Sequence, residues 1–216
     1  MPQPATTYKK KERVEARSRG AAKQRAMATA KRILLGDGYA RLTMERVAIE
    51  SGVAKTTIYR HWLTKAALCM ELYLDAAREL TDPKTGGVVS DLRCIAETVV
   101  RLQTRTVAGP ALIGLIAEAQ INPETSDPFL GEFAERRRSV TRSVLRRAMQ
   151  CGELHPDTDV DLVIDALGGA ITFRLLQGHA PIDQKFTNSL IDLVLGGCRM
   201  SGAKQGKDKQ GRRRKC

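Results

Sequence analysis

The chain has 216 residues, a formal net charge of +12 and 42% hydrophobic residues, few of which are aromatic. This length suits one large or two small domains with a substantial hydrophobic core. The longest apolar run, from Pro110 to Ala117, is too short to span a bilayer, and no apolar stretch follows the lysines at 9–11 as it would in a signal peptide. Five cysteines, an odd number without a CxxC pair, do not indicate a disulfide framework. We therefore expect a cytoplasmic protein that does not span a membrane.

The positive charge is distributed unevenly along the chain. Residues 1–19 contain six basic and two acidic side chains, residues 20–64 eight and three, and residues 201–216 seven and one. Residues 65–200 instead contain fifteen basic and eighteen acidic side chains. Basic regions attached to a slightly acidic body predict nucleic acid as the partner of one end only. We predict a basic flexible arm over 1–19, a DNA-binding domain over 20–64, a body over 65–200 and a basic flexible tail over 201–216.

Two short helices joined by a tight turn are predicted between residues 42 and 62. Thr43 is the candidate N-cap of the first helix. Gly52 falls where this helix must end in a left-handed residue, which glycine adopts without a Cβ clash. Ala48 is small where two crossing helices must approach closely, and Ile58 is apolar on the second helix. Together with Gly52 they predict the internal core of a helix-turn-helix.

The second short helix leaves polar side chains pointing outward. Hydrogen-bonding and cationic groups are what a helix needs to contact base edges and phosphates. A polar helix face alone more often faces only solvent, but this one belongs to a helix-turn-helix in a basic region. We therefore assign DNA-binding roles to Lys55, Thr56, Thr57, Tyr59, Arg60 and His61. Trp62, at the end of the helix, is interpreted as a core residue between this domain and the next helix rather than as a base-stacking one.

Residues 21–68 resemble the DNA-binding domain of the TetR family of bacterial transcription regulators. The resemblance is carried by Ile33-Leu34-Leu35, Gly38-Tyr39, Leu42-Thr43-Met44, Val47-Ala48, the run from Gly52 to Trp62, and Lys65-Ala66-Ala67-Leu68. It implies an all-α protein with an N-terminal three-helix helix-turn-helix domain, followed by a larger helical ligand-binding and dimerisation domain. It also implies a double-stranded DNA operator as partner, with phosphate contacts at Thr43 and Lys65.

Apolar residues at helical spacing continue through the body. One long helix is predicted from Asp127 to Gln150, and the last two helices from Val160 to Leu176 and from Asp183 to Met200. In the resembled family the last two helices pair with those of a second subunit, which implies a homodimer. The stripe expected on the first of these helices is Val160, Ile164, Leu167, Ile171 and Leu175, with Gly168-Gly169 explained by a close helix contact.

The body also contains an excess of medium-sized apolar side chains with a few polar ones between them. Ligand pockets among helices are usually apolar with a small number of placed polar groups, so we expect a mainly hydrophobic small-molecule effector. For each single side chain, simple filling of the core is the alternative. The candidate ligand-binding residues are Gln103, Ile116, Gln120, Phe129, Phe133, Phe173 and Arg174.

These patterns favour a sequence-specific transcription regulator, most often a repressor, that a small hydrophobic ligand releases from a palindromic operator. An enzyme is disfavoured, because His61, His155 and His179 are scattered without a nucleophile–base pair. Cys151 and His155 have metal-ligand spacing but no second pair, so we expect no metal and no cofactor. The remaining alternative is an architectural protein that binds nucleic acid through its basic ends without sequence preference.

Overall fold

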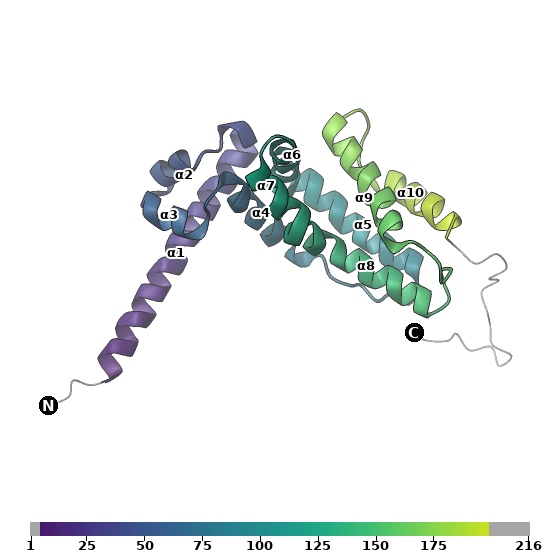
Figure 1. The fold of residues 1–216 in the computed structure, drawn as a ribbon, viewed down its shortest axis with the longest axis horizontal. Coiled ribbons are helices and arrows are strands. Elements are labelled where there is room, and N and C mark those ends of the chain that lie inside the picture. The colour runs from purple at the N-terminus through teal and green to yellow at the C-terminus, as the bar shows by residue number, and fades with distance from the viewer. Residues whose placement is uncertain (1–4, 199–216) are drawn as a thin grey trace.

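The computed structural model describes the backbone of residues 5–198 and the side chains of residues 20–198. Every element within this part of the chain is helical, which confirms the predicted all-α fold (Figure 1). The α-helices are α1 (Ala5–Asp37), α2 (Met44–Ser51), α3 (Lys55–His61), α4 (Lys65–Ala76), α5 (Val88–Arg105), α6 (Ala108–Ala119), α7 (Pro123–Pro128), α8 (Ala134–Gln150), α9 (Val160–Gln177) and α10 (Gln184–Gly196). None of the described helices is long and apolar enough to cross a membrane.

The helix-turn-helix forms as the sequence predicts. The Thr43 hydroxyl accepts a hydrogen bond from the Arg46 N–H at 3.1 Å and caps α2. Gly52 ends α2 with a φ of 64°, in the left-handed region. Ala48 and Ile58 are buried between α2 and α3. The end of α1 packs against both short helices, and all three lie at one end of the molecule (Figure 1).

Helix α1 is longer than the sequence analysis predicted. It begins at Ala5, so residues 5–19, which we expected to form a flexible arm, have a helical backbone. Alanine, lysine, arginine and glutamate make up most of this stretch, and it contains neither glycine nor proline. These residues favour helices, and the expectation of a flexible arm gave their charge too much weight. The predicted tail over 201–216 lies outside the described residues.

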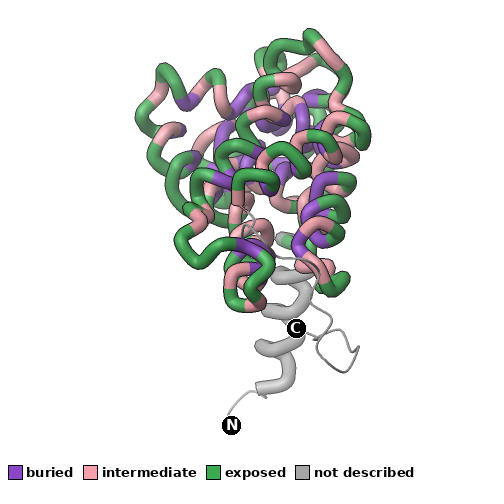
Figure 2. The backbone as a smooth tube through the Cα atoms, turned by 90° about the vertical axis from the view of Figure 1, so that its right-hand side faces the viewer, coloured by how far each residue is buried: buried purple, intermediate pink, exposed green. Residues whose placement is uncertain are grey.

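The hydrophobic core does not stop at the boundary predicted near residue 64. One cluster of buried side chains runs from α1, α2 and α3 through α4 and α6 to Phe129 and Phe133. A second cluster joins α5, α8, α9 and α10 in the rest of the body. Figure 2 shows the buried stretches of backbone on the inner sides of the helices, with exposed residues outside. The DNA-binding end and the near half of the body therefore share one core.

The long helix predicted from Asp127 to Gln150 is interrupted. A π-helical segment, Phe129–Phe133, separates α7 from α8, and the backbone of Gly131 within it is not helical (φ −82°, ψ −118°). Phe129 and Phe133 are nevertheless buried, at 9% and 3% exposure. The apolar spacing thus predicted burial correctly but concealed the break at Gly131.

The loop between α4 and α5 is fastened to α8 by Arg147. Its guanidinium donates through both Nη atoms to Asp82 in the loop and through Nη2 to Asp91 of α5 at 2.6 Å. Asp91 is 2% exposed and also accepts hydrogen bonds from the N–H and the hydroxyl of Thr85. Burial raises the pKa of Asp91, but the hydrogen bonds from Thr85 and Arg147 outweigh it and hold the pKa below its ordinary value.

Candidate DNA-binding surface and ligand cavity

Helix α3 presents the predicted polar residues to solvent. Five of the six assigned side chains are exposed, and Thr57 is half-buried; the exposed ones are Lys55, Thr56, Tyr59, Arg60 and His61. Ile58, on the opposite face, is 1% exposed. The helix is therefore held by its apolar side while its hydrogen-bonding side remains free for a partner.

Glu45 on α2 holds two of these outward side chains in place. Its Oε1 accepts a hydrogen bond from the Tyr59 hydroxyl at 3.1 Å and lies 3.7 Å from Lys55 Nζ. The hydrogen bond to Glu45 raises the pKa of Tyr59. The pKa of Glu45 is lowered, first by its backbone hydrogen bond and then by Tyr59. Sequence reasoning did not identify Glu45, because this contact joins two helices across the turn.

Trp62 is a core residue, as predicted. It is 2% exposed, and its indole N–H donates to Glu71 Oε2 on α4 at 2.6 Å. Lys23 of α1 pairs with the same carboxylate at 2.6 Å and lies over the indole ring at 5.7 Å. Trp62 thus joins α1, α3 and α4 and is not available to stack on a base.

Lys65 lies at the start of α4, and its side chain packs against α6. Its Nζ lies 3.4 Å from Glu118 Oε2 on α6 and 4.2 Å from the centre of the Tyr39 ring. The Thr64 hydroxyl accepts from the Ala67 N–H, which leaves the N–H groups of Lys65 and Ala66 without acceptors among the described residues. The phosphate contact that the resemblance implies at Lys65 would therefore use the free N–H groups of the helix start.

Tyr39 links the DNA-binding end to the body. Its hydroxyl donates to Glu118 Oε2 at 2.9 Å, and Thr125 of α7 donates to Oε1 of the same carboxylate at 2.9 Å. The ring lies against Gly114 of α6, where an added Cβ would come within 2.0 Å of it. Burial, followed by the nearby Cys69 and Glu118, raises the pKa of Tyr39. The sequence analysis did not identify this contact, and a glycine within the short apolar helix α6, Gly114, is the feature that could have indicated it.

The body contains a cavity of about 470 Å³ between α4, α5, α8, α9 and α10. Aliphatic side chains from α5, α9 and α10 form most of its wall, and Tyr73 of α4 closes one side. The charged and hydroxyl groups on the wall include Arg137, Arg138 and Thr141 of α8 and Asp165 of α9. Among the residues the structure describes, no group of three or more His, Cys, Asp or Glu side chains could hold a metal ion.

None of the seven residues proposed for ligand binding lines this cavity. Phe129 and Phe133 belong to the hydrophobic core, with Phe133 packed edge-on against Tyr73 at 5.2 Å between ring centres. Gln103 is 6% exposed and its Oε1 has no hydrogen-bond partner among the described residues.

The other candidates are also placed elsewhere. Ile116 is partly buried against the same core, and Gln120 is exposed. Phe173 is 58% exposed, and Arg174 lies 3.5 Å over the ring of Phe186. Helical spacing identified apolar faces in the body, but it could not determine which of them face the cavity.

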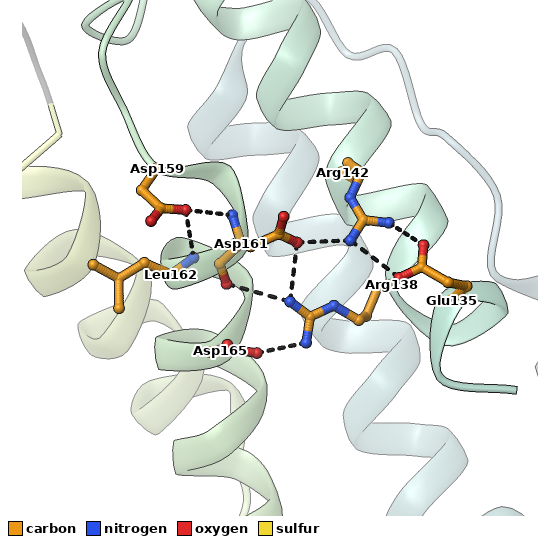
Figure 3. A network of polar contacts seen from close by, with 7 residues as sticks. All are labelled: Glu135, Arg138, Arg142, Asp159, Asp161, Leu162 and Asp165. Carbon is orange, nitrogen blue, oxygen red and sulfur yellow. Dashed lines mark hydrogen bonds and ion pairs between the residues drawn. The ribbon is translucent and has the colours of Figure 1, made fainter. Parts of the chain in front are cut away.

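Arginines of α8 are joined to α9 by a network of ion pairs (Figure 3). Arg138 pairs with Asp165 at 2.5 Å and with Asp161 at 3.0 Å. Arg142 pairs with Asp161 at 2.6 Å and with Glu135 at 2.5 Å. Arg138 and Arg142 are thereby paired with acidic side chains of this subunit.

Comparison with known proteins supports the division into a helix-turn-helix end and a helical body. The family described as "Bacterial regulatory proteins, tetR family" matches residues 26–72, and "Tetracyclin repressor-like, C-terminal domain" matches residues 82–194. The chain belongs to the TetR family of transcription regulators. It is 34% identical over 173 residues to the DNA-binding transcriptional repressor TetR of Mycobacteroides abscessus, covering 78% of this chain and 89% of that one.

Solved structures of TetR-family regulators have the same fold. The crystal structure of the regulator SCO0332 superposes with a TM-score of 0.69 at 35% identity, covering 82% of this chain and 98% of that one. FadR from Bacillus subtilis, in complex with stearoyl-CoA, superposes with a TM-score of 0.64, covering 82% of this chain and 99% of that one. At 17% identity, this likeness shows the fold alone.

In this TetR-family chain, α9 is apolar on two opposite faces. The predicted stripe faces inward, since Ile164, Leu167 and Ile171 are buried against the body. The outward face repeats apolar or small residues at alternating spacings of four and three: Leu162, Ala166, Gly169, Phe173 and Leu176. An added Cβ at Gly168 or Gly169 meets no atom of the described residues within 4 Å. The predicted close helix contact at these glycines is therefore not made within the described part of this subunit.

Proposed function

We propose that this TetR-family regulator is a dimeric repressor that binds a palindromic operator and leaves it when a small, mainly hydrophobic molecule occupies the body. The observation that carries the proposal is the arrangement of α3, whose apolar face is buried while its cationic and hydrogen-bonding face is exposed. Such a face suits base edges and phosphates in the major groove. The Mycobacteroides abscessus relative, named as a repressor, supports the direction of regulation.

The dimer is proposed to form through the outward faces of α9 and α10, at the end of the molecule away from α3 (Figure 1). Leu162 and Phe173 on α9 and Leu193 on α10 are 65%, 58% and 76% exposed. Spacings of four and three place a stripe along one side of a helix, as in packed helix pairs. A two-fold dimer would present two copies of α3 to DNA, which requires a separation of about 34–36 Å or a multiple.

Helix α4 provides a direct connection between the proposed ligand and DNA sites. It begins at Lys65, beside α3, and carries Tyr73 to the wall of the cavity. Its twelve residues span about 18 Å, so a shift of Tyr73 moves the helix end next to α3. An effector that binds one position of α4 better than the other would change operator affinity by that difference. FadR from Bacillus subtilis, which shares this fold, is solved in complex with stearoyl-CoA, and this supports a small-molecule ligand for the present chain.

Selection of DNA from a random pool by the purified full chain tests the proposal. We expect enriched sequences with two inverted half-sites, and binding that survives competition by unrelated DNA. An architectural protein would instead enrich no sequence, and its affinity would fall steeply with salt for every DNA. That outcome would refute the operator and support the alternative function.

The dimer is tested with Phe173→Asp, which places a charge in the proposed interface. The variant should sediment as a monomer and lose the two-half-site operator while its helical content is retained. Ile121→Asp is the matched control, because Ile121 is 85% exposed and lies outside the stripe. An unchanged dimer in the Phe173 variant would place the interface elsewhere. A substitution at Ile171 would not test the interface, since Ile171 is buried and lines the cavity.

A further inference from the structure

The cavity wall contains one arginine whose surroundings differ from those of its neighbours on α8. Arg138 and Arg142 are occupied by Glu135, Asp161 and Asp165 (Figure 3). Arg137 lines the cavity but forms no ion pair and no hydrogen bond with any described residue. Because Asp165 is already paired with Arg138, the positive charge of Arg137 remains uncompensated at the cavity.

The guanidinium of Arg137 is held by aromatic rings. Its Cζ lies 5.4 Å from the centre of the Tyr73 ring and 5.7 Å from that of Phe133. Such contacts stabilise a cation, but they accept none of its N–H hydrogen bonds. Its Nε is buried from solvent and has no acceptor among the described residues. A buried donor without an acceptor is unfavourable. A ligand that brings an acceptor into the cavity would therefore form a favourable hydrogen bond with Arg137.

Thr141 extends this donor site along α8. It follows Arg137 by four residues, so the two side chains project from the same face of the helix. Thr141 also lines the cavity, and its hydroxyl is without a hydrogen-bond partner among the described residues. The rest of the wall is mainly aliphatic. The cavity therefore combines a large apolar surface with one local group of donors that includes a cation.

We propose that the effector is an amphipathic carboxylate whose carboxyl group binds Arg137 and whose apolar part fills the space between α5, α9 and α10. A carboxylate matches the guanidinium, since both are planar and form two parallel charge-assisted hydrogen bonds. This inference rests on the proposed function, because it names the chemical class of the ligand at the same cavity. It also gives the ligand a direct contact with α4, since Tyr73 packs against Arg137.

The test compares three probes of equal chain length, octanoate, 1-octanol and octylamine, by calorimetric titration of the full chain at neutral pH. Octanoate should bind at least about tenfold more tightly than octanol, since a hydrogen bond to a charged group contributes on the order of this factor. Octylamine should bind most weakly. In Arg137→Gln the preference for octanoate over octanol should disappear, and in Arg137→Lys it should be reduced.

Arg136→Gln is the matched control. Arg136 is the adjacent residue, is exposed and pairs with Glu132, so its replacement changes the net charge equally without altering the cavity. Thermal unfolding of each variant without probe establishes whether the variant is folded. If Arg137→Gln does not fold, Arg137→Lys still provides the test. Equal binding of octanoate and octanol to the original chain would overturn the proposal. So would failure of all three probes to bind, or an octanoate preference that persists in both Arg137 variants.

The operator experiment separates this inference from the proposed function. If the chain without probe selects no DNA sequence while octanoate still binds through Arg137, the regulator proposal fails and the carboxylate site stands. If an operator is bound but octanoate shows no preference, the ligand class is wrong and the DNA-binding function stands.

Discussion

At the DNA-binding end the outward residues come from one seven-residue helix, α3, whereas the cavity in the body collects side chains from five helices. The face of α3 follows directly from sequence spacing, because neighbouring residues on one helix have fixed relative directions. The cavity depends on how α4, α5, α8, α9 and α10 pack. Substitutions on α3 should therefore act locally on DNA binding, whereas substitutions in the body should act through packing and stability.

The largest effect is expected in the body, from Arg147→Met. The variant leaves Asp91 buried beside an apolar side chain, which costs about 3–5 kcal/mol of unfolding free energy. Urea denaturation measures the loss. Arg146→Met, at the exposed neighbouring position, should change stability by less than about 0.5 kcal/mol. Similar stabilities for the two variants would show that the Arg147 network does not secure the body.

The same network predicts a dependence of stability on acid. Hydrogen bonds from Arg147 lower the pKa of Asp82, and those from Thr85 and Arg147 lower that of Asp91 against the effect of burial. A carboxyl whose folded pKa is lowered stabilises the protein above its unfolded pKa of about 3.9, and this contribution is lost as pH falls below that value. Unfolding free energies at pH 7, 5, 4 and 3 should therefore converge for the original chain and Arg147→Met below pH 4. A constant difference would contradict the assignment.

At the DNA-binding end, Thr57→Ala and Tyr59→Ala should each weaken operator binding by roughly 1–3 kcal/mol. Both side chains lie on the outward part of α3, so the unfolding free energy should hardly change. Gel-shift titrations with the selected operator measure the effect, with the exposed Gln150→Ala as control. Operator affinity equal to that of the original chain in both variants would remove α3 as the recognition helix.

The link between the two regions is tested at Tyr39 and Glu118. Tyr39→Phe removes the hydroxyl but keeps the ring against Gly114, and should cost about 1 kcal/mol of unfolding free energy. A double-mutant cycle with Glu118→Gln should give a coupling energy of similar size. Additive effects of the two substitutions, within about 0.3 kcal/mol, would mean that this hydrogen bond does not join the regions.

The smallest effect is expected from Glu45→Gln. Removing this exposed charge beside α3 should strengthen binding to all DNA sequences slightly, because a repulsive group is lost and Lys55 is released. Binding isotherms at two salt concentrations measure it, and Glu97→Gln on α5 serves as control. A change confined to one base position would instead give Glu45 a part in sequence recognition.

Much of the DNA-binding end could be predicted from the sequence. The cap at Thr43, the left-handed Gly52 and the buried Ile58 depend on residues within one turn of each other, and the structure has all three. The body was predicted less completely. The helices formed near their expected positions, but the π-helical break at Gly131 and the second, outward apolar face of α9 were not foreseen.

The sequence by itself determined most of the helical elements, α3 among them, and the outward side chains of α3, because helix period and capping are local properties. Only the tertiary structure decided which of the two apolar faces of α9 packs inside, and which arginine of α8 lacks an acidic partner. It also placed Lys65 against Glu118 and Tyr39 against Gly114. These pairings join residues far apart in the chain, and their energies depend on burial and distance, which no local spacing specifies.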